Sequence, residues 1–270
     1  MSTLTPTWKD RLETVLWYGY TGLIAFFLAL PVLAIIIASF YEGQIFALPY
    51  EFSLKWYEAV LTSSGVRSAV ITTLLTSLPV MVLSTVIGTA AALGYTRYDF
   101  TGKEYFKIFA LLPIFFPLIL LGLGMSMWFH LTGLGTGLVP TIIGQTVWIS
   151  PIVMFVVSLR ALSIDPNIED AAKDLGAGQV TMYKDVILPP ILDGVIAGAI
   201  FAFVLSWNNY YIASYLLGPN NSITTWIHGQ LGFSFAPLVP AVASVIFYVS
   251  TLLVVIALSF LWWWGGSGGD

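Results

Sequence analysis

Apolar residues along this chain fall into six long runs, and most charged side chains lie in the stretches between them. The runs cover about 15–40, 68–95, 106–130, 137–162, 190–217 and 238–263. Each run is long enough to cross roughly 30 Å of hydrocarbon at about 1.5 Å per helical residue. Because lipid offers no hydrogen-bond partner to an open strand edge, the pattern predicts an all-α, polytopic membrane protein with about six transmembrane helices.

Composition agrees with this prediction and orients the chain. Of the 270 residues, 58% are hydrophobic and 9% are charged, whereas a soluble domain has roughly 25% charged residues. Lysine and arginine are enriched in cytoplasmic loops. If the N-terminus is cytoplasmic, only Lys55 and Arg67 lie on the outer side of the membrane. The other basic residues then lie in the cytoplasm: Lys9, Arg11, Arg97, Lys103, Lys107, Arg160, Lys173 and Lys184. We therefore predict that both termini are cytoplasmic.

Several kinds of chemistry are not expected on this chain. It has no cysteine, so disulfides, thiolate metal sites and a cysteine nucleophile are excluded. His130 and His228 are far apart in sequence and have no acidic neighbours, so we predict no metal site and no catalytic residue. No basic patch suggests nucleic acid. Gly102-Lys103 is followed by Glu104 and is not a phosphate-binding loop, so ATP hydrolysis is not expected here.

One segment between the fourth and fifth runs departs from the apolar pattern. Residues 168–190 read IEDAAKDLGAGQVTMYKDVILPP. Six of the 24 charged residues (10 basic and 14 acidic) lie in this segment: Glu169, Asp170, Lys173, Asp174, Lys184 and Asp185. The predicted orientation makes the segment cytoplasmic.

Capping residues predict two short helices in this segment. In Asp165-Pro166, the aspartate can cap free N–H groups and the proline suits the first helical position. Gly176 suits the position just after a helix end. We therefore predict one helix over 166–175. A second helix is expected over 179–188, where Pro189-Pro190 ends it and begins the fifth span.

The surface of the first helix leaves two interpretations open. Ala171 and Ala172 are small, Leu175 is expected to be exposed, and charged residues flank all three. A small-residue face with one apolar side chain suits docking into a groove of another protein. The alternative is a solvated connecting loop with incidental helicity.

The segment resembles a known signature. Residues 170–189, DAAKDLGAGQVTMYKDVILP, are similar to the EAA signature of ABC importer permeases: E-A-A, three residues, G, nine residues, then I-x-L-P. Both spacings are kept, with Asp170 in place of Glu and Val186 in place of Ile. The resemblance extends from about Arg67 to the C-terminus. The stretch SWNNYYIASYLLGP in the fifth span also resembles the spermidine/putrescine permease subgroup.

This resemblance implies a type I ABC importer permease fold in the inner membrane of a prokaryote. It implies that the loop forms coupling helices on a separate ABC ATPase dimer, which holds ATP and Mg²⁺, and that this chain carries no cofactor. Further implied partners are a second permease subunit, with a heterodimer favoured over a homodimer, and an extracytoplasmic solute-binding protein. The implied coupling residues are Glu169, Asp170, Ala171, Ala172, Asp174, Leu175, Gly176 and Ala177.

The same resemblance suggests a division of the chain. We expect an N-terminal tail, first helix and periplasmic loop over 1–66. A permease core follows over 67–264, with the coupling loop at 164–189. Residues 265–270 are expected to be a flexible tail.

A polar cluster in the fifth span is the candidate solute pathway, because polar groups within a membrane often mark such pathways. Its residues are Ser206, Trp207, Asn208, Asn209, Tyr210 and Tyr211. On a continuous helix Ser206, Asn209 and Ala213 share one stripe, and the aromatic rings can stack on a ligand. The alternative is an asparagine that holds helices together by a hydrogen bond.

The substrate class stays open at this stage. Carboxylates suit a cationic polyamine, whereas Asn208 and Asn209 supply no charge. A small polar solute of the polyamine, opine, amino-acid-derivative or phosphonate type is expected. The rival functions are an ion-gradient-driven secondary transporter, which predicts buried charges and an internal repeat, and a scaffold without a solute path.

Overall fold

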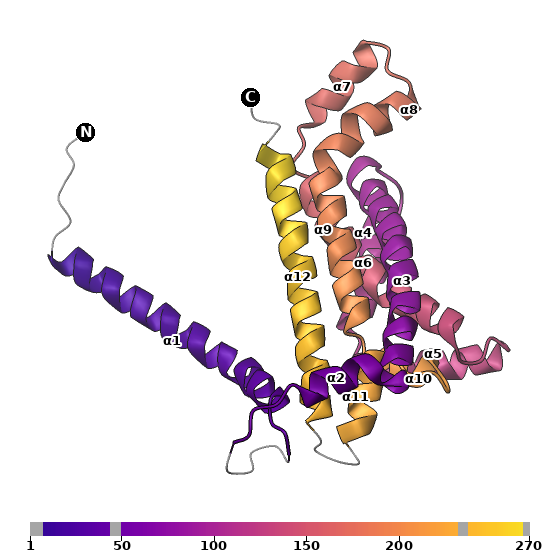
Figure 1. Ribbon diagram of the computed structural model, residues 1–270. Helices are drawn as coiled ribbons and strands as arrows, with labels where there is room; N and C mark the ends of the chain where they lie inside the picture. Colours follow the sequence, from indigo (N-terminus) through magenta and orange to yellow (C-terminus); the bar gives the residue numbers. More distant parts are fainter. Residues whose placement is uncertain (1–7, 44–49, 232–236, 267–270) are drawn as a thin grey trace. The chain divides into compact units, whose positions relative to one another are not determined.

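The computed structural model describes residues 8–43, 50–231 and 237–266, and the regular elements within them are helices. One isolated antiparallel bridge joins Tyr41 and Phe52. The helices shown in Figure 1 are α1 (Trp8–Ser39), α2 (Lys55–Thr62), α3 (Ser64–Arg97), α4 (Lys103–Phe115), α5 (Leu118–Leu131), α6 (Leu138–Ala161), α7 (Pro166–Asp174), α8 (Gln179–Thr181), the π-helix η1 (Met182–Ile187), α9 (Leu188–Trp207), α10 (Tyr211–Leu216), α11 (Ile223–Leu231) and α12 (Leu238–Gly266).

The helices form two compact units. One contains residues 1–62 and 233–248, and the other contains residues 63–232 and 249–270. In the first unit, Tyr57 shares a 2.7 Å hydrogen bond with Ser39 through their hydroxyl groups. The ring of Phe40 stacks on that of Phe52. These contacts join the end of α1 to α2 and the turn before it.

The second unit is built on α3, α6 and α9, which lie side by side in Figure 1. Its core contains fully buried aliphatic side chains from all three helices, including Val80, Ile149, Val153, Val157 and Ile191. Small residues allow this close packing, as expected where lipid gives helices no hydrophobic drive to associate. This unit carries the charged loop between α6 and α9.

The predicted number of spans is confirmed. Within the described residues, five helices are long and apolar enough to cross a membrane, and a sixth crossing results if α4 and α5 count as one span. The axes of α4 and α5 differ by 103°, so the span predicted over 106–130 is sharply bent rather than one continuous helix. The break falls at Pro117, which lacks an N–H group, and the preceding Phe116 has extended backbone (φ −77°, ψ 135°), as proline requires of its neighbour.

Two boundaries around the fifth span also differ from the predictions. The helix predicted over 179–188 does not end at Pro189-Pro190, because η1 leads directly into α9. In this π-helical turn the Leu188 N–H donates to the Tyr183 carbonyl, five residues back. The span predicted to continue to residue 217 instead ends at Trp207, and α10 begins only at Tyr211.

Candidate functional site: the loop between α6 and α9

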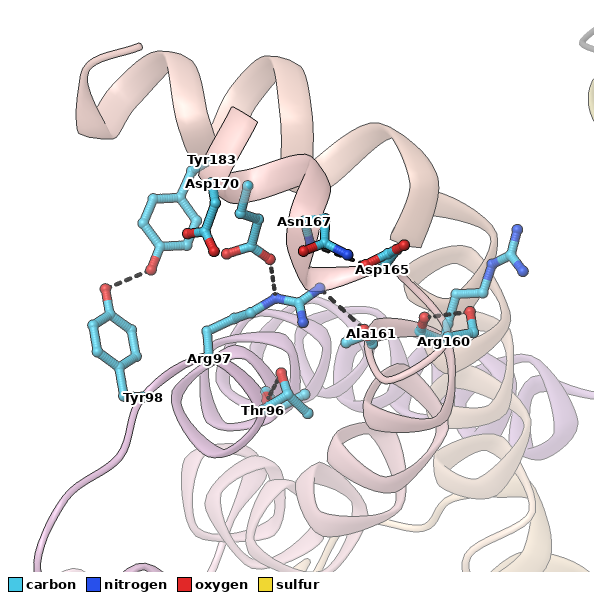
Figure 2. Close-up of polar contacts among 12 residues, drawn as sticks. Thr96, Arg97, Tyr98, Arg160, Ala161, Asp165, Asn167, Asp170 and Tyr183 are labelled. Carbon is cyan, nitrogen blue, oxygen red and sulfur yellow. Dashed lines mark hydrogen bonds and ion pairs between the residues drawn. The ribbon is translucent and has the colours of Figure 1, made fainter. Parts of the chain in front are cut away.

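The helix predicted at the start of the loop is confirmed as α7. Asp165 caps it, since its carboxylate accepts a 2.9 Å hydrogen bond from the Asn167 N–H (Figure 2). At the other end, the Gly176 N–H donates to Lys173 and the Ala177 N–H donates to Ala172. This pair of bonds is a Schellman motif. It requires Gly176 in the left-handed region, at φ +86°.

The predicted coupling residues lie on two faces of α7 and its turn. The outer face includes Asp170, Ala171, Asp174 and Leu175, all exposed, and the Leu175 side chain is 90% exposed. The Lys173 ammonium lies 2.9 Å from the Asp170 carboxylate, and this hydrogen bond raises the pKa of Lys173. This face combines a small alanine, one exposed apolar side chain and flanking charges, a combination that suits docking into a groove of another protein.

Three predicted residues face the permease core instead. Ala172 and Ala177 are half-buried and pack against the aliphatic core cluster. The Glu169 carboxylate lies 2.7 Å from the Arg97 guanidinium. Ala172 and Glu169 therefore support the loop from within, while Ala171 and Leu175 are free to touch a partner.

Arg97 is a site residue that the sequence argument missed. It is the last residue of α3 and, besides the pair with Glu169, its Nη2 donates a 3.0 Å hydrogen bond to the carbonyl of Ala161 at the end of α6 (Figure 2). Nearby, the hydroxyl groups of Tyr98 and Tyr183 share a hydrogen bond. The sequence offered one signal for this contact: Arg97 ends an apolar run, and an acidic helix with Glu169 follows later in the chain.

The predicted pathway cluster lies at the junction of α9 and α10, where the chain is not helical between Asn208 and Tyr210. Ser206 is buried and its hydroxyl donates to Gln145 of α6. The Asn209 carboxamide is also buried and accepts a 3.0 Å hydrogen bond from the Ile212 N–H. The Asn209 side-chain bond is local, at the start of α10, whereas the bond that joins two helices comes from Ser206.

The other members of the cluster differ in exposure. Trp207 is buried, Tyr210 is half-buried, and Asn208 and Tyr211 are exposed. The Tyr210 ring stacks on that of His228, with 4.4 Å between ring centroids. Gln145, 1% exposed, is a polar residue within the fourth span that the sequence argument did not single out. The exposed members, Asn208 and Tyr211, are available to line a path.

Comparison with known sequences identifies the family. A family described as "Binding-protein-dependent transport system inner membrane component" matches residues 84–262. A spermidine/putrescine transport system permease protein of Escherichia coli (strain K12) is 26% identical over 238 residues, covering 87% of this chain and 90% of that protein. A putrescine transport system permease protein of the same strain is 27% identical over 240 residues, covering 86% and 84%.

Solved structures show the same fold. A bacterial ABC transporter involved in the import of the acidic polysaccharide alginate has a TM-score of 0.69 at 18% identity, covering 97% of this chain and 99% of that one. An inward-facing methionine ABC transporter has a TM-score of 0.62 at 16% identity, covering 78% and 98%. The family match covers well over half of this chain. The chain therefore belongs to the binding-protein-dependent transport system inner membrane components and is a multi-pass permease subunit of an ABC importer, not an enzyme.

Proposed function

We propose that this chain forms half of a solute translocation pathway and receives the movement of a separate ATPase through α7 and the turn after it. The observation that carries this proposal is the outer face of α7, where Leu175 is 90% exposed next to the exposed Ala171. Closure of the motor on ATP would move α7 and bias the pathway between inward-open and outward-open states, by the difference in ATP affinity between those states.

The proposal includes the partners that such a subunit needs. They are an ABC ATPase dimer that holds ATP and Mg²⁺, a second permease and an extracytoplasmic solute-binding protein. A structural relative supports this kind of assembly, since the alginate ABC transporter forms a complex with an alginate pentasaccharide-bound periplasmic protein. We favour a heterodimer of permeases because the sequence resembles the spermidine/putrescine subgroup.

The proposed substrate is a small polar organic solute of the polyamine, opine, amino-acid-derivative or phosphonate type. The relatives named for spermidine and putrescine support the polyamine end of this range. The exposed Asn208, just after α9, and the exposed Tyr211, at the start of α10, offer an amide and an aromatic ring to such a solute. The substrate class is tested by measuring uptake of labelled spermidine by the assembled transporter. Unlabelled solutes of each of the other classes are added as competitors.

An ion-gradient-driven transporter is not favoured. That alternative requires charged residues within the spans. Among the described residues, the buried polar residues are serines, threonines, Gln145 and Asn209, and none is charged.

Docking of α7 is tested with single cysteines, which the cysteine-free chain allows without background. Leu175→Cys is expected to cross-link to the ATPase in the intact assembly. The matched control is Asp99→Cys, whose position in the turn between α3 and α4 is also exposed. Absence of a Leu175 cross-link to any nucleotide-hydrolysing subunit would overturn the proposed coupling.

A charge on the outer face should separate docking from folding. Ala171→Glu places a charge on the exposed side of α7, whereas Ala172 is half-buried against the core and a charge there also disturbs packing. We expect Ala171→Glu to abolish ATP-driven uptake while membrane insertion and expression remain normal. Unchanged uptake at equal expression would contradict the proposal.

A further inference from the structure

Arg97 joins three helices at one end of the permease core. The residue belongs to α3, its Nε lies 2.7 Å from Glu169 of α7, and its Nη2 donates to the Ala161 carbonyl of α6. Figure 2 shows the Arg97 side chain between the end of α3 and the loop. The carbonyl end of α6 carries a partial negative charge, so the guanidinium meets two negative groups at once.

The pair of Arg97 and Glu169 differs from the other ion pairs of the described residues in its burial. Its side chains are 9% and 15% exposed. The next most protected cation is Lys103, at 27%, and its partner Asp99 is 98% exposed. Exposed pairs hold helices together weakly, because water and salt screen them. Arg97 and Glu169 are shielded from water, so their charge attraction is screened much less.

The backbone gives α7 few other connections to the core. Among the described elements, its only extensive contact is with η1, the segment that leads into α9. The hydroxyl bond between Tyr98 and Tyr183 lies at the same end and links the residue after α3 to η1. Side chains therefore carry the connection from α7 to α3 and α6.

We infer that Arg97 is a positioning residue for coupling: it clamps α7 to the ends of α3 and α6, so that displacement of α7 moves these spans with it. The inference rests on the proposed function, because it assumes that an ATPase moves α7. It adds a residue outside the 164–189 loop to the coupling apparatus. It also assigns Glu169 to the clamp and leaves the outer face of α7 to the partner.

The test measures whether α7 and α3 move as one body. Spin labels are placed at Asn167→Cys on α7 and Val86→Cys on α3, both exposed positions, in the complete transporter with and without Mg·ATP. With Arg97 present we expect one narrow inter-label distance that Mg·ATP leaves unchanged. Arg97→Gln is expected to lose the narrow distance, and Arg97→Lys, which keeps the charge, is expected to recover it.

Two further variants keep the test decisive. Lys103→Gln removes a charge from the exposed pair at the same end and should preserve the narrow distance. If Arg97→Gln fails to assemble, Glu169→Gln removes the same pair from the α7 side with an isosteric amide, and it should lose the narrow distance. If the distance between the two labels stays narrow and independent of nucleotide in Arg97→Gln or Glu169→Gln, the clamp hypothesis is wrong.

Failure of the clamp is distinguishable from failure of the proposed function. The Leu175→Cys cross-link to the ATPase is measured in parallel preparations that carry only this cysteine, with Arg97 intact or replaced. If the cross-link forms but the inter-label distance is the same in the parent protein and in Arg97→Gln, only the clamp is wrong. If the cross-link is absent in the parent protein, the proposed coupling itself is wrong.

Discussion

At the scale of single residues, Gly88 decides how closely α3 approaches α6. A Cβ atom added to Gly88 would lie 2.6 Å from the Val153 Cβ and 2.8 Å from the Ser150 carbonyl oxygen. Real Cβ atoms do not approach other atoms this closely, so a larger residue forces the two helices apart. The site lies against Val153, which is fully buried in the core.

Gly88→Ala is therefore expected to destabilise the permease by overpacking. We expect a loss of about 1–3 kcal/mol in the free energy of unfolding, measured from thermal or denaturant unfolding in detergent. Gly94→Ala on the same helix is the control, since an added Cβ there meets nothing within 4 Å. Equal stability of the two variants would show that this close packing does not limit stability.

At the scale of elements, the loop between α6 and α9 has one left-handed glycine turn and one widened helical turn. Gly176 ends α7 in the left-handed region at φ +86°. Further on, η1 widens the helix before Pro189 and Pro190, whose nitrogens cannot donate to a preceding turn. A π-turn accommodates such an interruption without ending the helix. The loop between α6 and α9 is therefore continuous with the fifth span through η1.

Gly176→Ala should weaken the end of α7. An L-residue in the left-handed region costs about 1–2 kcal/mol, so we expect faster amide hydrogen exchange in α7 and a lower transport rate. Gly178→Ala is the control two residues away, because Gly178 has an ordinary φ of −69° and open space around it. Exchange in α7 that is equally slow in both variants would contradict a role for the Gly176 turn.

At the scale of the whole molecule, charge orients the second unit in the membrane. Arg97, Arg160 and the α7 loop lie at one end of the helices, whereas α11 lies at the other, where its Ile223 N–H donates to Thr73 in the early part of α3 (Figure 1). Basic side chains thus concentrate at the end that carries α7, which the positive-inside tendency assigns to the cytoplasm.

This orientation predicts opposite labelling of two single cysteines. In intact cells, a membrane-impermeant maleimide should label Asn220→Cys, which is exposed between α10 and α11. It should label Leu175→Cys only after the membrane is opened. Labelling of Leu175→Cys in intact cells would show that α7 lies outside the cell. A cytoplasmic ATPase could then not contact it.

The sequence by itself determined the helical membrane class, the approximate spans and the helix over 166–174. These features depend on local causes: the length of apolar runs, the cap at Asp165 and the glycine at 176. The structure decided the rest, because a proline in an apolar run can either break a helix or be accommodated in it. At Pro117 the axes of α4 and α5 diverge by 103°, whereas η1 carries the helix past Pro189-Pro190 into α9, which ends at Trp207. The pairing of Arg97 with Glu169 joins residues far apart in the chain, and only the folded core brings such side chains together.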